Sequence, residues 1–370
     1  MPALANQRTS GAALPQSAGR SIRVMLVDDS LVVRSVLERI IDSQPGMALC
    51  ASVSSAADAL AWLAADRADV IILDIEMPGM SGLTALPHIL EQAAHARVLI
   101  LSSNCEEGGP AAIEALARGA SDTLAKPGKG SFAGQFSEIL VQRVRTLAAG
   151  PMSYVPAAAP KIPPARLSVA YDSDAELACI AVAASTGGIP AFASFISNLD
   201  PRIDAPILLT QHLPDAFIPY YAQQIAAASK RTVFVARPGM RLQQRAVYLA
   251  PGDAHLSLVR MGRHVEILLE YHAVANGCCP SADPMFAAAA EVFGAQAAGI
   301  VLSGMGRDGA EGAAELRRSG GLVLAQAPES CVVWGMPGAV ANSGTAHAVL
   351  NPDAMAVLLG RNAAKNWSVA

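Results

Sequence analysis

The chain has 370 residues, of which 52% are hydrophobic, and a formal net charge of −4 at pH 7. This length predicts two domains rather than one, and the small acidic excess argues against a large surface for nucleic acid. Much of the hydrophobic fraction is alanine, and no charge-free apolar stretch is long enough to cross a bilayer, so we expect no insertion into a membrane.

The N-terminal segment and the cysteines bear on the cell compartment. Residues 1–21 lack the apolar core of a secretory signal and are expected to form a flexible tail. Six cysteines are scattered without metal-ligand spacing or the density of a disulfide framework, which favours a reduced, cytoplasmic protein. The adjacent pair Cys278-Cys279 is unusual, but incidental loop cysteines explain it more simply than a redox site does.

Short apolar runs alternate with helical patterns between residues 22 and 147, where we expect the first domain. The expected strands are 24–27, 70–73, 98–102 and 123–125. Apolar residues recur at helical spacing after the first run, at Val33, Val36, Leu37, Ile40 and Ile41. Strands that alternate with helices predict an α/β domain with a doubly wound parallel sheet of the flavodoxin-like kind.

The ends of these runs carry polar side chains that could act together. Asp28 and Asp29 follow the first run, Asp74 follows the second, Ser102 ends the third and Lys126 follows the last. Converging carboxylates repel one another unless a hard cation such as Mg²⁺ binds their oxygens. A hydroxyl and a lysine beside them suit a phosphoryl group on an aspartate, so the pattern predicts a phosphorylation site that uses Mg²⁺.

On these residues, the segment 22–127 resembles the receiver domain of two-component response regulators. The matching motifs are Val27-Asp-Asp-Ser30, Leu73-Asp-Ile-Glu-Met-Pro78, Gly82-Leu83, Ser102 and Lys126-Pro127. One departure is Thr123, which stands where the family often has an aromatic switch residue. The resemblance therefore implies a phosphorylated receiver but leaves an aromatic switch in question.

The same resemblance implies a role for each polar residue. Asp74 is the implied phospho-acceptor, with a chemotaxis histidine kinase as phosphodonor. Ser102 and Lys126 are the implied switch and phosphate-binding residues. The implied metal ligands are Asp28, Asp29, Asp74 and the backbone carbonyl of Glu76.

A proline-rich segment separates the two halves of the chain. Residues 148–176 hold five prolines among alanines and small polar residues, which favours a semi-extended linker. A second domain is expected over 177–362 and a short tail over 363–370. The tail contains Asn366-Trp367, which resembles the tether peptides of some chemoreceptors, although an aromatic residue packed on its own domain is the simpler interpretation.

Three apolar runs of the second half lead to a serine, a histidine and an aspartate. The runs are 179–184, 207–210 and 299–302. Ser185 and His212 follow the first two, and Asp308 lies in the glycine-rich stretch after the third. Carboxyl ends of parallel strands meet at one edge of a sheet, so we expect the three side chains to converge. A histidine that deprotonates the serine and a carboxylate that orients the histidine are the parts of a serine hydrolase.

The turn after Ser185 favours binding of an oxyanion. Proline is favoured at the first position of a helix, and Gly187-Gly188-Ile189-Pro190 follows the serine. A helix N-terminus there would direct the backbone N–H of Thr186 and a partial positive charge at the oxyanion. The small residues Ala183 and Gly187 permit a tight strand-to-helix turn, although alanine fits less freely than glycine.

The region 177–360 resembles the catalytic domain of the chemotaxis protein-glutamate methylesterases. Besides the three polar strand ends, the matching stretches are Ala250-Pro-Gly-Asp-Ala-His255, Pro280-Ser-Ala-Asp283 and Val333-Trp-Gly-Met-Pro337. The resemblance implies that the backbone N–H of Met305 is a second oxyanion donor. Ala183 replaces a glycine, and Cys278-Cys279 replaces a frequent histidine and arginine, so the substrate cleft could differ in detail.

Receiver, linker and hydrolase in this order imply a phosphorylation-activated enzyme built from two doubly wound α/β domains, flavodoxin-like and Rossmann-like. Its implied substrates are glutamate 5-O-methyl esters of methyl-accepting chemoreceptors, with deamidation of receptor glutamines as a second activity. The ester chemistry would need no cofactor. The family also implies that the receiver covers the catalytic cleft until it is phosphorylated.

Two other functions fit parts of the sequence. A response regulator that binds DNA would need a helix-turn-helix or a basic face, and neither is visible after residue 150. A domain in which Ser185-Thr-Gly-Gly188 cradles a phosphate would leave His212 and Asp308 without a role. A gel shift and a serine-directed phosphonate would separate these two functions from the hydrolase.

Overall fold

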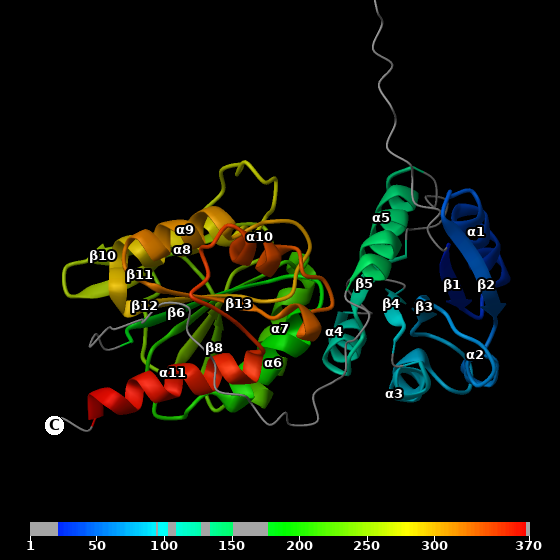
Figure 1. The fold of residues 1–370 in the computed structure, drawn as a ribbon, viewed down its shortest axis with the longest axis horizontal. Coiled ribbons are helices and arrows are strands. Elements are labelled where there is room, and N and C mark those ends of the chain that lie inside the picture. Colours follow the sequence, from blue (N-terminus) through cyan, green and yellow to red (C-terminus); the bar gives the residue numbers. More distant parts are fainter. Residues whose placement is uncertain (1–20, 94, 103–108, 127–133, 151–176, 368–370) are drawn as a thin grey trace, which may run out of the picture.

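The computed structural model describes residues 21–93, 95–102, 109–126, 134–150 and 177–367. It shows two α/β units that pack against each other (Figure 1). Much of the predicted tail and linker lies outside the described residues. The residues concerned are 1–20 of the N-terminal tail, 151–176 of the linker and the last three residues of the chain. Among the described helices, none combines the length and the apolarity that a membrane span requires.

The first unit contains a parallel sheet of five strands in the order β2-β1-β3-β4-β5. Its strands are β1 (Ile22–Val27), β2 (Met47–Val53), β3 (Val70–Asp74), β4 (Arg97–Ser102) and β5 (Asp122–Ala125). Its helices are α1 (Leu31–Asp42), α2 (Ala56–Leu63), α3 (Gly82–Gln92), α4 (Gly109–Ala117) and α5 (Gln135–Ala149). The predicted flavodoxin-like α/β arrangement is confirmed.

Alternate strand residues of this unit face two hydrophobic layers. Val24 and Leu26 of β1 belong to the layer that contains residues of α1 and α5, whereas Met25 and Val27 belong to the layer with α2, α3 and α4. Both faces of the sheet are therefore covered. This explains why the central strands are continuous apolar runs rather than alternating ones.

The second unit contains a parallel sheet of seven strands in the order β14-β13-β12-β6-β7-β9-β8, and an antiparallel hairpin, β10-β11. Its strands are β6 (Cys179–Ala184), β7 (Ile207–Gln211), β8 (Thr232–Val235), β9 (Ala246–Leu249), β10 (His255–Met261), β11 (His264–Glu270), β12 (Ala297–Val301), β13 (Leu322–Gln326) and β14 (Ala348–Leu350). Its α-helices are α6 (Gly188–Asn198), α7 (Ile218–Ala228), α8 (Ala282–Phe293), α9 (Ala310–Arg318), α10 (Met336–Asn342) and α11 (Pro352–Trp367). Short 3₁₀ turns are η1 (Asp215–Phe217), η2 (Gly294–Gln296) and η3 (Pro328–Ser330).

The order of these strands creates a switch point at the carboxyl end of β6. The chain leaves β6, adds β7 on one side, and later adds β12 on the other side. In open α/β sheets, ligands bind in the crevice that forms where the strand order reverses in this way. The residues after β6, β7 and β12 are therefore placed where the fold provides a binding cleft.

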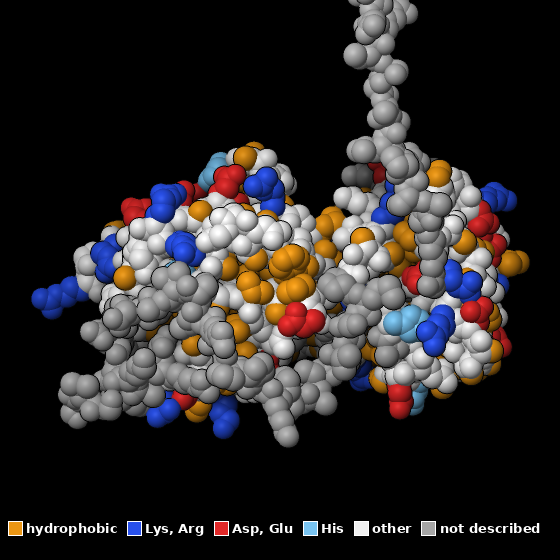
Figure 2. All heavy atoms as spheres, in the orientation of Figure 1, with side chains coloured by type: hydrophobic (Ala, Val, Ile, Leu, Met, Phe, Trp, Pro, Cys, Tyr) orange, Lys and Arg blue, Asp and Glu red, His pale blue; other side chains and the backbone are white. Residues whose placement is uncertain are grey.

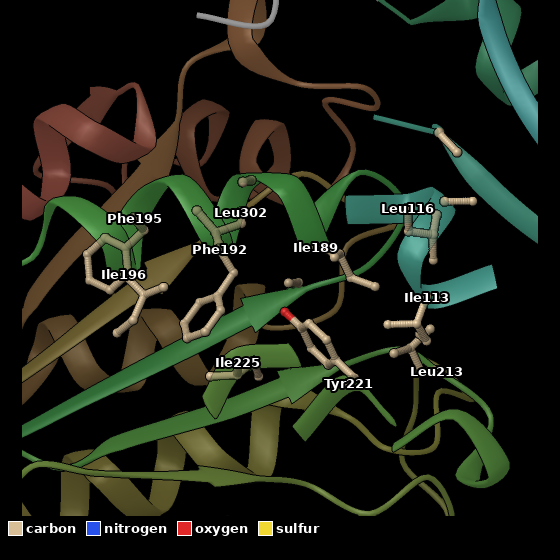
Figure 3. Packing of buried hydrophobic residues seen from close by; sticks show 14 of the residues in the cluster. Ile113, Leu116, Ile189, Phe192, Phe195, Ile196, Leu213, Tyr221, Ile225 and Leu302 are labelled. Carbon is tan, nitrogen blue, oxygen red and sulfur yellow. The ribbon is translucent and has the colours of Figure 1, made fainter. Parts of the chain in front are cut away.

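An apolar contact joins the two units. Ile113 and Leu116 of α4 belong to the same buried cluster as Ile189 and Leu213 of the second unit, and Figure 3 shows these four side chains near one another. A Cβ on Gly109 would lie 2.9 Å from the ring of Tyr220, so the backbone of α4 approaches α7 closely. The contact brings the first unit beside the switch point of the second.

The surface shows no face of a single charge sign in the view of Figure 2. Basic and acidic side chains are interspersed over both units on that face, and a hollow separates the upper parts of the two units (Figure 2).

Candidate active site

The turn that carries Ser185 depends on a glycine two residues later. Gly187 has a φ of +76°, a conformation that L side chains rarely adopt. A Cβ at this position would also lie 2.5 Å from the Cβ of Val332 and 2.8 Å from the Oγ of Ser303. Pro190 is the third residue of α6, not the first as predicted, because the two glycines already supply the turn and the helix begins at Gly188.

A buried serine, Ser303, holds this turn in place. Its carbonyl oxygen accepts the backbone N–H of Ser185 at 3.0 Å, and its Oγ donates to the carbonyl oxygen of Thr186 at 2.7 Å. The amide of Gln211 donates to the carbonyl oxygen of Ser185 at 2.9 Å. The nucleophile candidate is therefore fixed from both neighbouring strands, β12 and β7. Sequence reasoning missed Ser303 because its role depends on contacts more than one hundred residues away in the chain.

His212 and Asp308, predicted to act together, are joined by a hydrogen bond. The Nε2 of His212 and the Oδ2 of Asp308 are 2.7 Å apart, and the side chain of Asp308 is 1% exposed. Since Nε2 donates to the carboxylate, Nδ1 is the ring nitrogen that can accept a proton from Ser185. Ser185 and His212 line the same cavity, whose volume is about 250 Å³.

Three further donors hold the carboxylate of Asp308. Ser281 and Asn276 donate to its Oδ1, each at 2.6 Å, and the backbone N–H of Ala282 donates to its Oδ2 at 2.8 Å. Burial opposes ionisation of Asp308. The hydrogen bond and charge interaction with His212, together with the hydrogen bonds from Ser281 and Ala282, outweigh burial and lower the pKa of Asp308 to about 2. The carboxylate is therefore ionised at neutral pH and fixed in position. Ser281 lies in a stretch that the family resemblance had singled out, whereas Asn276 had no signal in the sequence.

Residues of the first unit reach into the same cavity. Thr186 donates its hydroxyl to the Oδ2 of Asp122 at 3.0 Å, and a guanidinium nitrogen of Arg143 lies 3.2 Å from that hydroxyl. Arg143 also forms an ion pair with Asp122. Thr146 donates its hydroxyl to the sulfur of Met305 at 3.2 Å. Both residues predicted to supply oxyanion donors, Thr186 and Met305, are thus contacted by the first unit.

The predicted phosphorylation site is assembled at the ends of β1, β3 and β5. The Nζ of Lys126 lies 2.8 Å from the Oδ2 of Asp28 and 2.8 Å from the Oδ2 of Asp74. Burial alone would lower the pKa of Lys126, but its hydrogen bonds to the two carboxylates outweigh burial and raise the pKa. For Asp74, burial dominates and raises the pKa of the carboxyl group despite the nearby ammonium. The site thus holds a partly neutralised acidic cluster.

The donor set of this cluster fits Mg²⁺. Carboxylate oxygens of Asp28, Asp29 and Asp74 all lie within 4.8 Å of one another, and Mg²⁺ prefers hard oxygen ligands. The Oγ of Ser102 is buried and has no hydrogen-bond partner among the described residues. Glu76, the remaining predicted ligand, lies two residues after Asp74 and donates its backbone N–H to the Oδ1 of Asp74 at 3.4 Å.

The two departures from the family pattern have different surroundings. Ala183 is fully buried within β6, where it contributes to the hydrophobic layer against α8 and α9. Cys278 lies on the loop before α8, and its Sγ lies within 4.8 Å of ligand atoms of His212 and Asp308. Burial and the charges of Asp308 and Asp283 raise the pKa of Cys278 to about 11. Cys279, in contrast, is exposed.

Comparison with known families divides the chain at the same place as the structure. Residues 24–131 match the response regulator receiver domain, and residues 180–359 match the CheB methylesterase. A protein named protein-glutamate methylesterase/protein-glutamine glutaminase 2 of Caulobacter vibrioides is 40% identical over 336 residues, which cover 90% of this chain and 96% of that protein. A protein of the same activity name from the group 2 operon of Rhodopseudomonas palustris is 35% identical and covers 89% of this chain and 91% of that protein.

Two solved structures from Thermotoga maritima, one for each unit, are among those similar to this chain. The catalytic domain of the Thermotoga maritima CheB methylesterase is 34% identical with a TM-score of 0.48, and the match covers 49% of this chain and 96% of that domain. The response regulator domain of Thermotoga maritima CheB is 40% identical with a TM-score of 0.32, and the match covers 34% of this chain and 95% of that domain.

Proposed function

Because the chain belongs to the family of protein-glutamate methylesterases/protein-glutamine glutaminases that carry a receiver domain, we propose that Ser185, His212 and Asp308 catalyse hydrolysis of glutamate 5-O-methyl esters on chemoreceptors. The observation that carries the proposal is the hydrogen bond between His212 and the buried Asp308 at a cavity that Ser185 also lines. A phosphate cradle at the same turn would not account for this bond.

The first half of the reaction forms an acyl-enzyme. The Oγ of Ser185 attacks the ester carbonyl carbon while the Nδ1 of His212 takes its proton, and Asp308 stabilises the imidazolium. The carbonyl oxygen becomes an oxyanion, which the backbone N–H groups of Thr186 and Met305 would bind. The tetrahedral intermediate then expels the methoxy group, which takes the proton from His212 and leaves as methanol.

The second half restores the enzyme. A water molecule gives one proton to the Nδ1 of His212 and attacks the acyl carbon. Collapse of the second tetrahedral intermediate returns the proton to Ser185 and releases a glutamate side chain. The same steps applied to a glutamine amide would expel ammonia instead of methanol, so one site accounts for both activities in the names of the relatives.

The receiver supplies the regulatory input. Asp74 would accept a phosphoryl group from a chemotaxis histidine kinase, with Asp28, Asp29, Asp74 and the backbone carbonyl of Glu76 as ligands of Mg²⁺. When bound, Mg²⁺ would neutralise negative charge during phosphoryl transfer. Lys126 would then leave Asp28 and pair with the phosphoryl oxygens, and Ser102 would donate its hydroxyl to them.

Strand β5 links this input to the esterase. Lys126 directly follows β5, and the first residue of β5 is Asp122. The carboxylate of Asp122 accepts a hydrogen bond from the hydroxyl of Thr186. In the unphosphorylated enzyme the receiver would cover the cavity through this contact and the apolar contact of α4. Phosphorylation must favour the uncovered arrangement by a few kcal/mol to change activity substantially.

The proposal is tested by methanol release from methylated receptor membranes, measured with and without a small-molecule phosphodonor. The wild-type protein is expected to release methanol and to do so faster with the phosphodonor. Ser185→Ala is expected to lose nearly all release, because no acyl-enzyme can form. Normal release by this variant would exclude the proposed mechanism.

A further inference from the structure

A group of potential metal ligands includes the proposed general base, His212. The Sγ of Cys278, a ring nitrogen of His212 and a carboxylate oxygen of Asp308 lie within 4.8 Å of one another. The three residues come from the loop before α8, the end of β7 and the glycine-rich stretch after β12. These residues have no metal-ligand spacing along the chain, because only the fold brings them together.

The donor types point to one class of ion. In proteins, Zn²⁺ binds thiolate, imidazole and carboxylate ligands. A zinc site frequently has three protein ligands and one open position. We propose that Zn²⁺ binds to Cys278, His212 and Asp308 and thereby inhibits the esterase reversibly. The inhibition, but not the binding, rests on the function proposed for His212.

The surroundings of the group are arranged to support a bound ion. Asn276 donates its amide to the Oδ1 of Asp308 at 2.6 Å and accepts the backbone N–H of Cys278 at 2.8 Å through its Oδ1. Asn276 therefore fixes the cysteine loop to the carboxylate. Asn276 and Ser281 both hold Oδ1, whereas Oδ2 would keep only the backbone N–H of Ala282 once His212 bound the ion, so the ion would bind Oδ2. These hydrogen bonds would orient the ligand as outer partners do in metal sites.

Binding of the ion displaces or moves the protons of its ligands. The thiol of Cys278 releases one proton to solvent as the S–Zn bond forms. If the ion binds the Nε2 of His212, it displaces the hydrogen bond to Asp308, and the proton of the neutral ring moves to Nδ1. If the ion binds Nδ1, it occupies that lone pair directly.

Inhibition follows from either arrangement. Nδ1 is the nitrogen that would accept the proton of Ser185, and in both cases it no longer has a free lone pair. The general base is lost while the protein remains folded and Ser185 remains in place. Removal of the ion by a chelator would restore the base.

The binding half is tested on the full-length protein with Co²⁺ as a spectroscopic probe. Thiolate ligation of Co²⁺ gives a sulfur-to-metal charge-transfer band, which is expected for the wild-type protein at one equivalent. Cys278→Ser is expected to lose the band and to weaken binding by at least about 100-fold, since a direct ligand matters more than the outer partners. Cys279→Ser is the matched control and is expected to keep the band, because Cys279 is exposed and lies outside the group. A band that persists in Cys278→Ser, or its absence in the wild type, would overturn the site.

The inhibition half is tested by methanol release at increasing free Zn²⁺, each variant compared with its own zinc-free rate. Wild type and Cys279→Ser are expected to lose activity together and to regain it with a chelator. Cys278→Ser is expected to need at least about 100-fold more Zn²⁺. Equal zinc sensitivity of Cys278→Ser and wild type would overturn inhibition at this site. If the wild-type protein released no methanol in the absence of zinc, the proposed esterase function would be contradicted. The Co²⁺ band would still test whether the three residues bind a metal ion.

Discussion

Thr186, which follows the proposed nucleophile in the chain, donates its hydroxyl to the carboxylate of Asp122 in the receiver at 3.0 Å. Both residues are buried, with exposures of 7% each. The residue that would stabilise the oxyanion is thus tied to the domain that would be phosphorylated. Control of the esterase can act through this bond without any change in Ser185, His212 or Asp308.

Arg143→Ala is expected to raise activity in the absence of a phosphodonor. The substitution removes the guanidinium that pairs with Asp122 and lies beside the hydroxyl of Thr186. A partly buried carboxylate left without its partner costs about 1–2 kcal/mol, which would shift the covered state toward the open state by about 5- to 30-fold. Arg145→Ala on the same helix is the control, because Arg145 is exposed and lies near Gln44 instead. Unchanged basal methanol release in Arg143→Ala would show that this contact does not restrain the enzyme.

Asp74→Asn is expected to abolish stimulation by a phosphodonor. The amide cannot form the acyl phosphate, so the rate of methanol release stays at the basal value while radiolabelled phosphate is not incorporated. Ser185→Ala serves as the reciprocal control, since it is expected to incorporate phosphate normally and to release no methanol. Stimulation of Asp74→Asn by the phosphodonor would place the phosphorylated residue elsewhere.

Ser281→Ala is expected to slow catalysis without preventing folding. The hydroxyl donates to the Oδ1 of Asp308 at 2.6 Å, and a hydrogen bond to a charged group contributes about 1.5–3 kcal/mol. Its loss raises the pKa of Asp308 and loosens the carboxylate that orients His212. We expect kcat to fall by about tenfold with little change in KM. NMR titration of the Asp308 carboxyl group should show the raised pKa, and an unchanged pKa of Asp308 would argue for a purely structural role of Ser281.

The acid stability of the protein is expected to depend on Asp308. Its folded pKa is lowered to about 2 from the usual 3.8, so its contribution is present above the unfolded pKa and is lost as pH falls toward 2. The contribution is about 2 kcal/mol. Urea unfolding at pH 7, 4 and 2 should show a smaller loss of unfolding free energy in Asp308→Asn than in the wild type. Equal losses in both proteins would mean that the depressed pKa has no such effect.

Gly187→Ala is expected to remove activity and reduce stability. The alanine would be strained at a φ of +76° and would meet Val332 and Ser303 at under 3.0 Å. Gly239→Ala is the matched control, because Gly239 has a φ of +78° and a Cβ there would have no neighbour within 4 Å. The control is expected to lose about 1–2 kcal/mol, the cost of the left-handed conformation alone, and to remain active. Thermal denaturation and methanol release would separate the two effects, and equal loss in both variants would contradict a steric role of the turn.

The strands that carry the site could be predicted because they are buried on both faces. β6 begins and ends at the predicted residues, and β7 and β12 differ by one or two residues at their ends. β2 was not predicted, since it is an edge strand in which only Met47 is fully buried. The half-buried residues of β2 include Ala, Cys and Ser, and they do not form the aliphatic run that signals a covered strand.

The polar residues at strand ends could also be predicted, because parallel strands bring their carboxyl ends together. Asn276, Ser303 and the pair Asp122–Arg143 could not, since each acts through a loop or a domain that approaches from far along the chain. The error at Pro190 has a local cause. Proline also tolerates the third position of a helix, where its missing N–H would have no partner inside the helix.

Strand β5 is only four residues long, and at about 3.3 Å per residue its first and last residues are separated by roughly 10 Å. Lys126, which follows one end, pairs with Asp74, the proposed phospho-acceptor, and Asp122 at the other end accepts a hydrogen bond from Thr186. A displacement at Lys126 therefore has only a short stretch of backbone, paired with β4, to cross before it reaches Asp122. A longer or more pliable connection would absorb that displacement, so the brevity of the strand makes the output sensitive to a single phosphoryl group.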